Sequence, residues 1–123
     1  MSDTPDPFAT YLERIAERTR GGEIAWARSA RWVLTTRRQT QSGEKTMLIQ
    51  RVPSGRLLDD PLGQDAEYDF QFQVVNVKDG QIEVSIDNRR TPALLVSLRS
   101  LYDAADRSVG SHSRRVLSEL AES

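Results

Sequence analysis

Few residues of this 123-residue chain combine the type and spacing that catalysis or metal binding needs. Cysteine is absent and His112 is the only histidine, so a metal site would need carboxylates for nearly all of its ligands. The acidic candidates are Asp59, Asp60 and Asp65 in one predicted loop, and Asp69 and Asp87 on two predicted strands. No Glu-x-Lys sequence of the kind found in metal-dependent nucleases accompanies them, and no glycine-rich phosphate loop occurs. We therefore expect no catalytic residues, no metal and no cofactor, and a protein that is not an enzyme.

Binding is better supported than catalysis, and the first predicted hairpin carries the candidate surface. If Gly43 closes a three-residue loop, one face of this hairpin carries Trp32, Leu34, Leu48 and Val52. The opposite face then carries Arg31, Val33, Arg37, Met47, Ile49 and Arg51. This second face is half apolar and half guanidinium, a composition typical of protein contact surfaces. We expect it to bind a protein partner or a second copy of the chain, unless a terminal helix covers it and the arginine heads reach past to solvent.

The alternative function is binding of nucleic acid or another anionic ligand through arginine. The contacts would come from Trp26, Arg28, Arg31, Arg37 and Arg38, with the indole as a stacking platform and the guanidinium groups on phosphates. Residues 18–56 carry a net charge of +7, but residues 57–87 carry −7, which also suits two hairpins that neutralise each other within one sheet. The whole chain has a net charge of −1 and a pI near 5.8, whereas dedicated nucleic-acid binders are usually basic. This function therefore ranks second.

The elements that position these residues follow from local patterns. Asp6-Pro7 favours a helix start, helical spacing of apolar residues continues the helix, and Gly21-Gly22 favours its end, which predicts a helix over about 7–20. The stretch 24–30 is ambiguous, although Trp26 within it should be at least half buried. Strand-type residues at 31–36 and 46–52 flank a turn at 41–44 and predict the first hairpin. A long connection over 53–66 follows.

The second predicted hairpin has a register that can be tested by arithmetic. Apolar residues alternate with polar ones over 67–77 and again over 81–87. A three-residue loop with Gly80 in the left-handed region pairs Phe72 with Ile86 and Val74 with Val84, which keeps the apolar side chains on one face. Thr91-Pro92 then predicts a helix start, and Gly110-Ser111 predicts an interruption before a short final helix.

The fold class that these elements predict is α+β, with an antiparallel sheet of about four strands packed by an N-terminal helix and one or two C-terminal helices. No repeat or low-complexity linker divides the chain, so we expect residues 1–123 to form a single domain. No apolar run is long enough to span a membrane, and the acidic start does not resemble a signal peptide. The expected protein is a small cytoplasmic accessory module, in a layout common among bacterial or phage proteins, that acts by binding a protein or by self-association.

Overall fold

A computed structural model describes residues 7–53 and 68–123. Its elements are α1 (Pro7–Arg20), β1 (Ala27–Ala30), β2 (Val33–Thr40), β3 (Gly43–Pro53), β4 (Tyr68–Asn76), β5 (Ile82–Asp87), the 3₁₀ turn η1 (Pro92–Leu94) and α2 (Leu95–Glu122). The predicted connection over 53–66, with Asp59, Asp60 and Asp65, lies outside the described residues apart from Pro53 at the end of β3.

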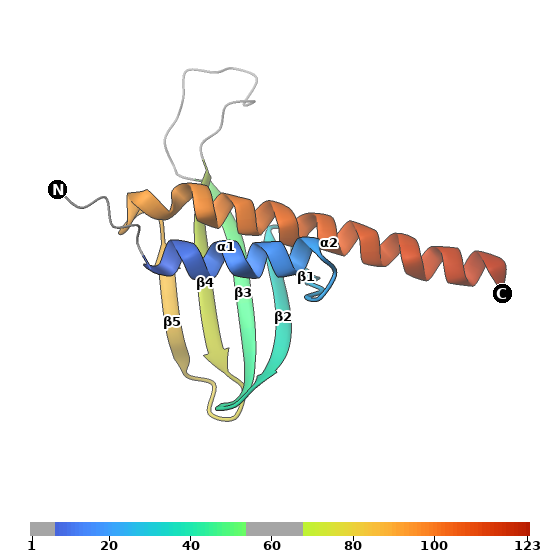
Figure 1. Cartoon of the computed structure of the whole chain (residues 1–123), viewed down its shortest axis with the longest axis horizontal. Coiled ribbons are helices and arrows are strands. Elements are labelled where there is room, and N and C mark those ends of the chain that lie inside the picture. Colours follow the sequence, from blue (N-terminus) through green and yellow to red (C-terminus); the bar gives the residue numbers. More distant parts are fainter. Residues whose placement is uncertain (1–6, 54–67) are drawn as a thin grey trace, which may run out of the picture.

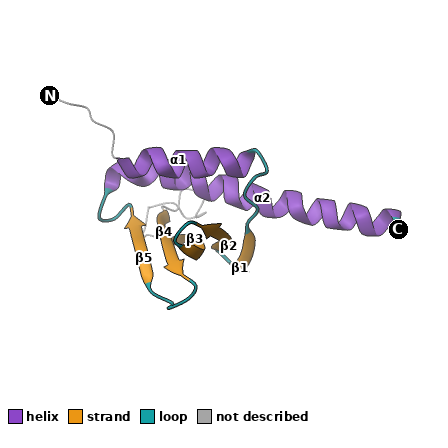
Figure 2. Ribbon diagram, turned by 60° about the horizontal axis from the view of Figure 1, so that its bottom comes forward, coloured by secondary structure: helices purple, strands orange, loops and turns teal. Residues whose placement is uncertain are grey.

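The five strands form one antiparallel sheet in the order β1-β2-β3-β4-β5. Both helices lie side by side across the same face of this sheet, and both run from the β5 edge toward the β1 edge (Figures 1 and 2). No helix of residues 7–53 and 68–123 lies on the opposite face (Figure 2). The α+β class is confirmed, with β1 as a fifth strand formed by the stretch that the sequence left ambiguous.

Helix α1 has the predicted bounds, Pro7–Arg20. Leu12 and Ala16 face the core, and Thr19 in the last turn is also buried. The Thr19 hydroxyl accepts a hydrogen bond from Trp26 Nε1 at 3.0 Å and donates one to the carbonyl of Ile15 at 2.8 Å. Trp26 is 2% exposed, which confirms its expected burial and ties the segment after α1 to the helix above it.

The second hairpin has the predicted register. Phe72 lies opposite Ile86 and Val74 lies opposite Val84. Gly80 has a φ of 71°, the left-handed conformation expected for it. An irregularity follows, because Val75 pairs with Ile82 and the ladder shifts by one residue.

The predicted facing of the first hairpin is wrong by one residue. Thr40 pairs with Gly43, so the turn holds two residues rather than three, and Leu34 lies opposite Ile49. The Thr40 hydroxyl donates to the carbonyl of Gly43 at 2.8 Å and helps to close this shorter turn. The shift brings Leu34 and Ile49 onto the same face, which is the face that the helices cover.

The core lies between the helices and this covered face. It contains the fully buried Leu34 and Ile49 of the sheet, Phe70 and Phe72 of β4, and a row of α2 residues. The α2 row consists of Leu98, Leu101, Tyr102, Ala104 and Ala105. Ile49 lies opposite Phe72 in the β3–β4 ladder, so two neighbouring strands place their largest buried groups side by side.

Helix α2 is one continuous helix of 28 residues, so the predicted interruption at Gly110-Ser111 does not occur. A single glycine inside a helix costs about 1 kcal/mol relative to alanine, which a long helix anchored by a core can tolerate. No helix within residues 7–53 and 68–123 is long and apolar enough to cross a bilayer.

Candidate functional site: an overhanging helix beside a basic cleft

Helix α2 is longer than the sheet that it covers. At 1.5 Å per residue, 28 residues extend about 42 Å, whereas five strands spaced by roughly 4.8 Å span about 19 Å. The helix crosses the strands and continues past the β1 edge into open space (Figures 1 and 2). Every residue from Gly110 to Ser123 is exposed. We call residues 110–122 the overhang.

The apolar stripe of α2 does not stop where the sheet stops. Leu98, Tyr102, Ala105 and Val109 recur at spacings of three and four residues and pack on the core. Val116 and Leu120 lie seven and eleven residues after Val109, which places them on the same side of the helix, and they are 40% and 66% exposed. The helix therefore presents the side that it buries over the sheet at a place where no described element covers it.

A charged stripe runs beside this apolar one. It consists of His112, Arg115, Glu119 and Glu122, again at spacings of three and four residues. Its first half carries His112 and Arg115, and its second half carries the carboxylates of Glu119 and Glu122. The order of charges along the overhang therefore reverses sign at its middle.

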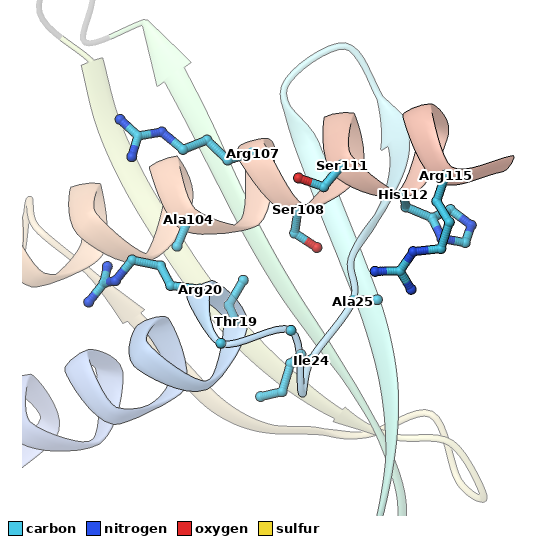
Figure 3. A pocket seen from close by; sticks show the side chains of 12 residues that line it. Thr19, Arg20, Ile24, Ala25, Ala104, Arg107, Ser108, Ser111, His112 and Arg115 are labelled. Carbon is cyan, nitrogen blue, oxygen red and sulfur yellow. The ribbon is translucent and has the colours of Figure 1, made fainter. Parts of the chain in front are cut away.

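A cleft with a volume of about 450 Å³ opens where the overhang leaves the domain (Figure 3). One wall is the end of α1 and the segment after it, from Thr19 to Ala25. The other wall is α2, from Ala104 to Arg115. Figure 3 shows His112 and Arg115 beside one another on the α2 wall, with Ser108 pointing into the cleft.

The cleft is basic. Among the described residues, its lining includes Arg20, Arg107, Arg115 and His112 but no carboxylate. Arg20 donates to the Ser100 hydroxyl at 3.4 Å, whereas Arg107, His112 and Arg115 make no hydrogen bond or ion pair with any described residue. Ser108 is engaged, because its hydroxyl accepts from the backbone N–H of Trp26 at 3.1 Å. Arg107, His112 and Arg115 thus present N–H groups in the cleft that no described residue engages.

The six residues predicted as a partner surface do not share one face. Ile49 is 0% exposed and Met47 is buried, so the helices cover both, which is the alternative that the sequence left open. Val33 and Arg37 lie on the opposite, uncovered face, where Arg37 is 3.9 Å from Glu44.

The two remaining arginines of that set pack on aromatic rings. The Arg31 guanidinium lies 4.9 Å from the centre of the Trp32 ring. The Arg51 guanidinium lies over Trp32, Tyr68 and Tyr102, 4.2 Å from the centre of the Tyr68 ring. These cation–π contacts hold both guanidinium groups against rings of the same chain, and not on the partner surface that the sequence predicted.

The residues predicted to contact nucleic acid are also dispersed. Trp26 is buried and cannot act as a stacking platform. Arg28 forms an ion pair with Asp106 and donates to the carbonyl of Arg31. Arg38 faces the helix side, where it donates to the Glu23 carbonyl at 3.1 Å, and Arg37 faces away from it.

Reasoning from the sequence did not select the overhang or the cleft. The sequence predicts a short final helix here, packed on the sheet, whereas the apolar residues Val116, Leu117 and Leu120 of the overhang are exposed. The signal that identifies the overhang is the length of α2 relative to a five-stranded sheet. Among the residues that the structure describes, no group of three or more His, Asp or Glu side chains could hold a metal ion. No protein-family model, curated protein or solved structure matches this chain.

Proposed function

We propose that the protein is a non-enzymatic self-associating module in which the overhang of one copy pairs, antiparallel, with the overhang of a second copy. The observation that carries this proposal is the continuation of the buried stripe of α2 into Val116 and Leu120 beyond the sheet. Burying exposed apolar area is the main favourable term in protein association. We therefore propose the C-terminal half of α2 as the contact surface in place of the first hairpin, whose Met47 and Ile49 belong to the core.

The order of charges favours a second copy as the occupant. A two-fold axis near Leu117 places Arg115 at the level of Glu119 of the second copy, and His112 at the level of Glu122. The same antiparallel arrangement places Val116 close to the level of Leu120 of the second copy. Each contact occurs twice, so the overhang is complementary to itself in charge and in apolar content.

The basic cleft extends this complementarity. The acidic half of the second overhang ends beside His112 and Arg115, which line the cleft at the foot of the first overhang. Pairs of this kind at the rim of an interface add little affinity, but they select the antiparallel orientation. One helix offers less than the roughly 800 Å² per partner of a standard interface, so we expect dissociation in the micromolar range.

Sedimentation equilibrium across a concentration series from low to high micromolar tests the proposal. Val116→Glu should weaken association more than about tenfold, since it places a charge in the apolar contact. Val96→Glu is the matched control, because Val96 lies in the same helix, is 74% exposed and is far from the overhang. A wild-type chain that stays monomeric throughout, or equal losses in both variants, would overturn the proposal.

A charge exchange tests the antiparallel register. Arg115→Glu or Glu119→Arg alone should weaken association by about five- to tenfold, because each puts like charges at the same level twice. The double variant should recover most of the wild-type affinity. Circular dichroism of each variant shows whether α2 remains helical. Recovery that fails in a helical double variant would contradict this register.

Binding of nucleic acid is the competing outcome. Fluorescence polarisation with short single- and double-stranded oligonucleotides, repeated at rising salt, measures it directly. Salt-sensitive binding at micromolar or tighter affinity, lost in Arg107→Ala and Arg115→Ala, would overturn self-association as the main function of this surface. The expected result is no binding at physiological salt.

A further inference from the structure

A second apolar surface, which no described residue fills, lies between α1 and the strands β2 to β5. It is a groove of about 330 Å³, a volume within the range of small-molecule sites. Phe8, Tyr11 and Ile15 of α1 line one side, and the strands supply Phe72 and Val74. The atoms that the lining presents are apolar throughout.

The rim of the groove at β2 and β3 carries two cations. Only apolar atoms of Arg38 and Lys45 line the groove, so their charged groups lie outside its lining, and the two residues lie directly opposite one another in the β2–β3 ladder. Like charges in this arrangement destabilise a sheet, so two cations facing each other need anionic compensation. Lys45 forms an ion pair with Glu83, whereas Arg38 pairs with no carboxylate that the structure describes and donates only to the Glu23 carbonyl.

Within the part of the chain that the structure describes, this pairing leaves the positive charge of Arg38 without a carboxylate beside an apolar groove. An amphipathic anion would satisfy both parts of this site, with its tail against Phe72 and Val74 and its head at Arg38. The guanidinium has five N–H donors in a fork that suits a carboxylate, and its single bond to a carbonyl leaves donors available.

We propose that the groove binds a free amphipathic carboxylate with a medium-length apolar tail. Tyr11, which is 62% exposed, lies at the open side by which the tail enters. The stem of Lys45 lines the groove while its ammonium pairs with Glu83, so this lysine shapes the site and Arg38 recognises the head.

Isothermal titration of the full chain with decanoate, below its micellar concentration, measures this binding. Decyltrimethylammonium has the same tail and the opposite charge, and butyrate has the same head and a short tail. Both should bind at least about tenfold more weakly than decanoate, because each lacks one of the two features that the site matches. Equal binding of decanoate and decyltrimethylammonium, or none of decanoate, would overturn the proposal.

Two neighbouring arginines supply the matched variants. Arg38→Gln should weaken decanoate binding at least about fivefold, whereas Arg37→Gln, on the uncovered face, should leave it unchanged. Val84→Trp should fill the groove and abolish binding, with circular dichroism and a thermal melt as checks of folding. Equal losses in the two arginine variants, or binding to anionic phospholipid vesicles but not to free decanoate, would contradict this site.

The groove and the overhang are separate, so the two proposals fail separately. Val116→Glu should weaken self-association and leave the affinity for decanoate unchanged. Arg38→Gln should weaken decanoate binding and leave self-association unchanged. Loss of decanoate binding in a folded Val116→Glu variant would show that the groove depends on the assembly, which contradicts the site as drawn from one chain.

Discussion

The facing of β3 can be tested with two adjacent residues. Ile49 is 0% exposed, lies opposite Leu34 and Phe72, and is covered by the helices. Ile49→Ala should therefore lower the free energy of unfolding by about 2–5 kcal/mol, since it removes buried methyl groups and leaves a cavity. Leu48 lies on the uncovered face, opposite Thr35 and half-buried, so Leu48→Ala should cost only about 1 kcal/mol or less.

Urea denaturation followed by tryptophan fluorescence measures both variants, because Trp26 lies in the core and reports its exposure on unfolding. In thermal melts, the Ile49→Ala change corresponds to a decrease of about 8–20 °C in Tm for a domain of this size. Protein concentration must be held constant, since association contributes to apparent stability. A loss for Leu48→Ala as large as that for Ile49→Ala would refute the observed register and favour the facing expected from the sequence.

Thr19→Val should destabilise the domain by about 1–3 kcal/mol, because it removes the acceptor for the buried Trp26 Nε1–H. Thr10 is exposed on the same helix, so Thr10→Val should leave the stability unchanged, and thermal melts of the two variants test the difference. Gly80→Ala should cost about 1–2 kcal/mol in urea denaturation, since alanine is strained at a φ of 71°. Gly110→Ala should instead raise the free energy of unfolding by about 1 kcal/mol or less, because no described atom crowds the new methyl group and alanine is the better helix former. Similar effects at the two glycines would contradict either the turn or the continuous helix.

The parts of the fold that the sequence predicted correctly are those that local chemistry determines. Helix α1 begins at a proline and ends before two glycines, and both ends were predicted at the right residue. The pairing of Phe72 with Ile86 followed from strict alternation on both strands, which permits one register with all apolar groups on one face.

The first hairpin could not be predicted in the same way because its deciding contacts are non-local. Two- and three-residue turns around residues 40–44 both leave mixed faces, since arginines and threonines interrupt the apolar pattern. The choice depends on β4, where Phe72 lies opposite Ile49 and requires it on the covered face. A pattern confined to one hairpin does not contain that information.

The uncovered face of the sheet shows why the two proposed surfaces lie elsewhere. Several of its polar side chains bond one another, as in the hydrogen bonds between Gln50 and Gln71 and between Gln73 and Ser85. Apolar residues such as Val33 and Leu48 stand singly among these polar groups, and an antiparallel sheet can keep a mixed face of this kind in water. The overhang and the groove differ, because each arises where a helix and the sheet do not match in extent: α2 runs past the β1 edge, and α1 leaves the lower part of the sheet open. Apolar surface without cover is thus a consequence of element lengths in this fold, and the charges beside each surface determine which partner can cover it.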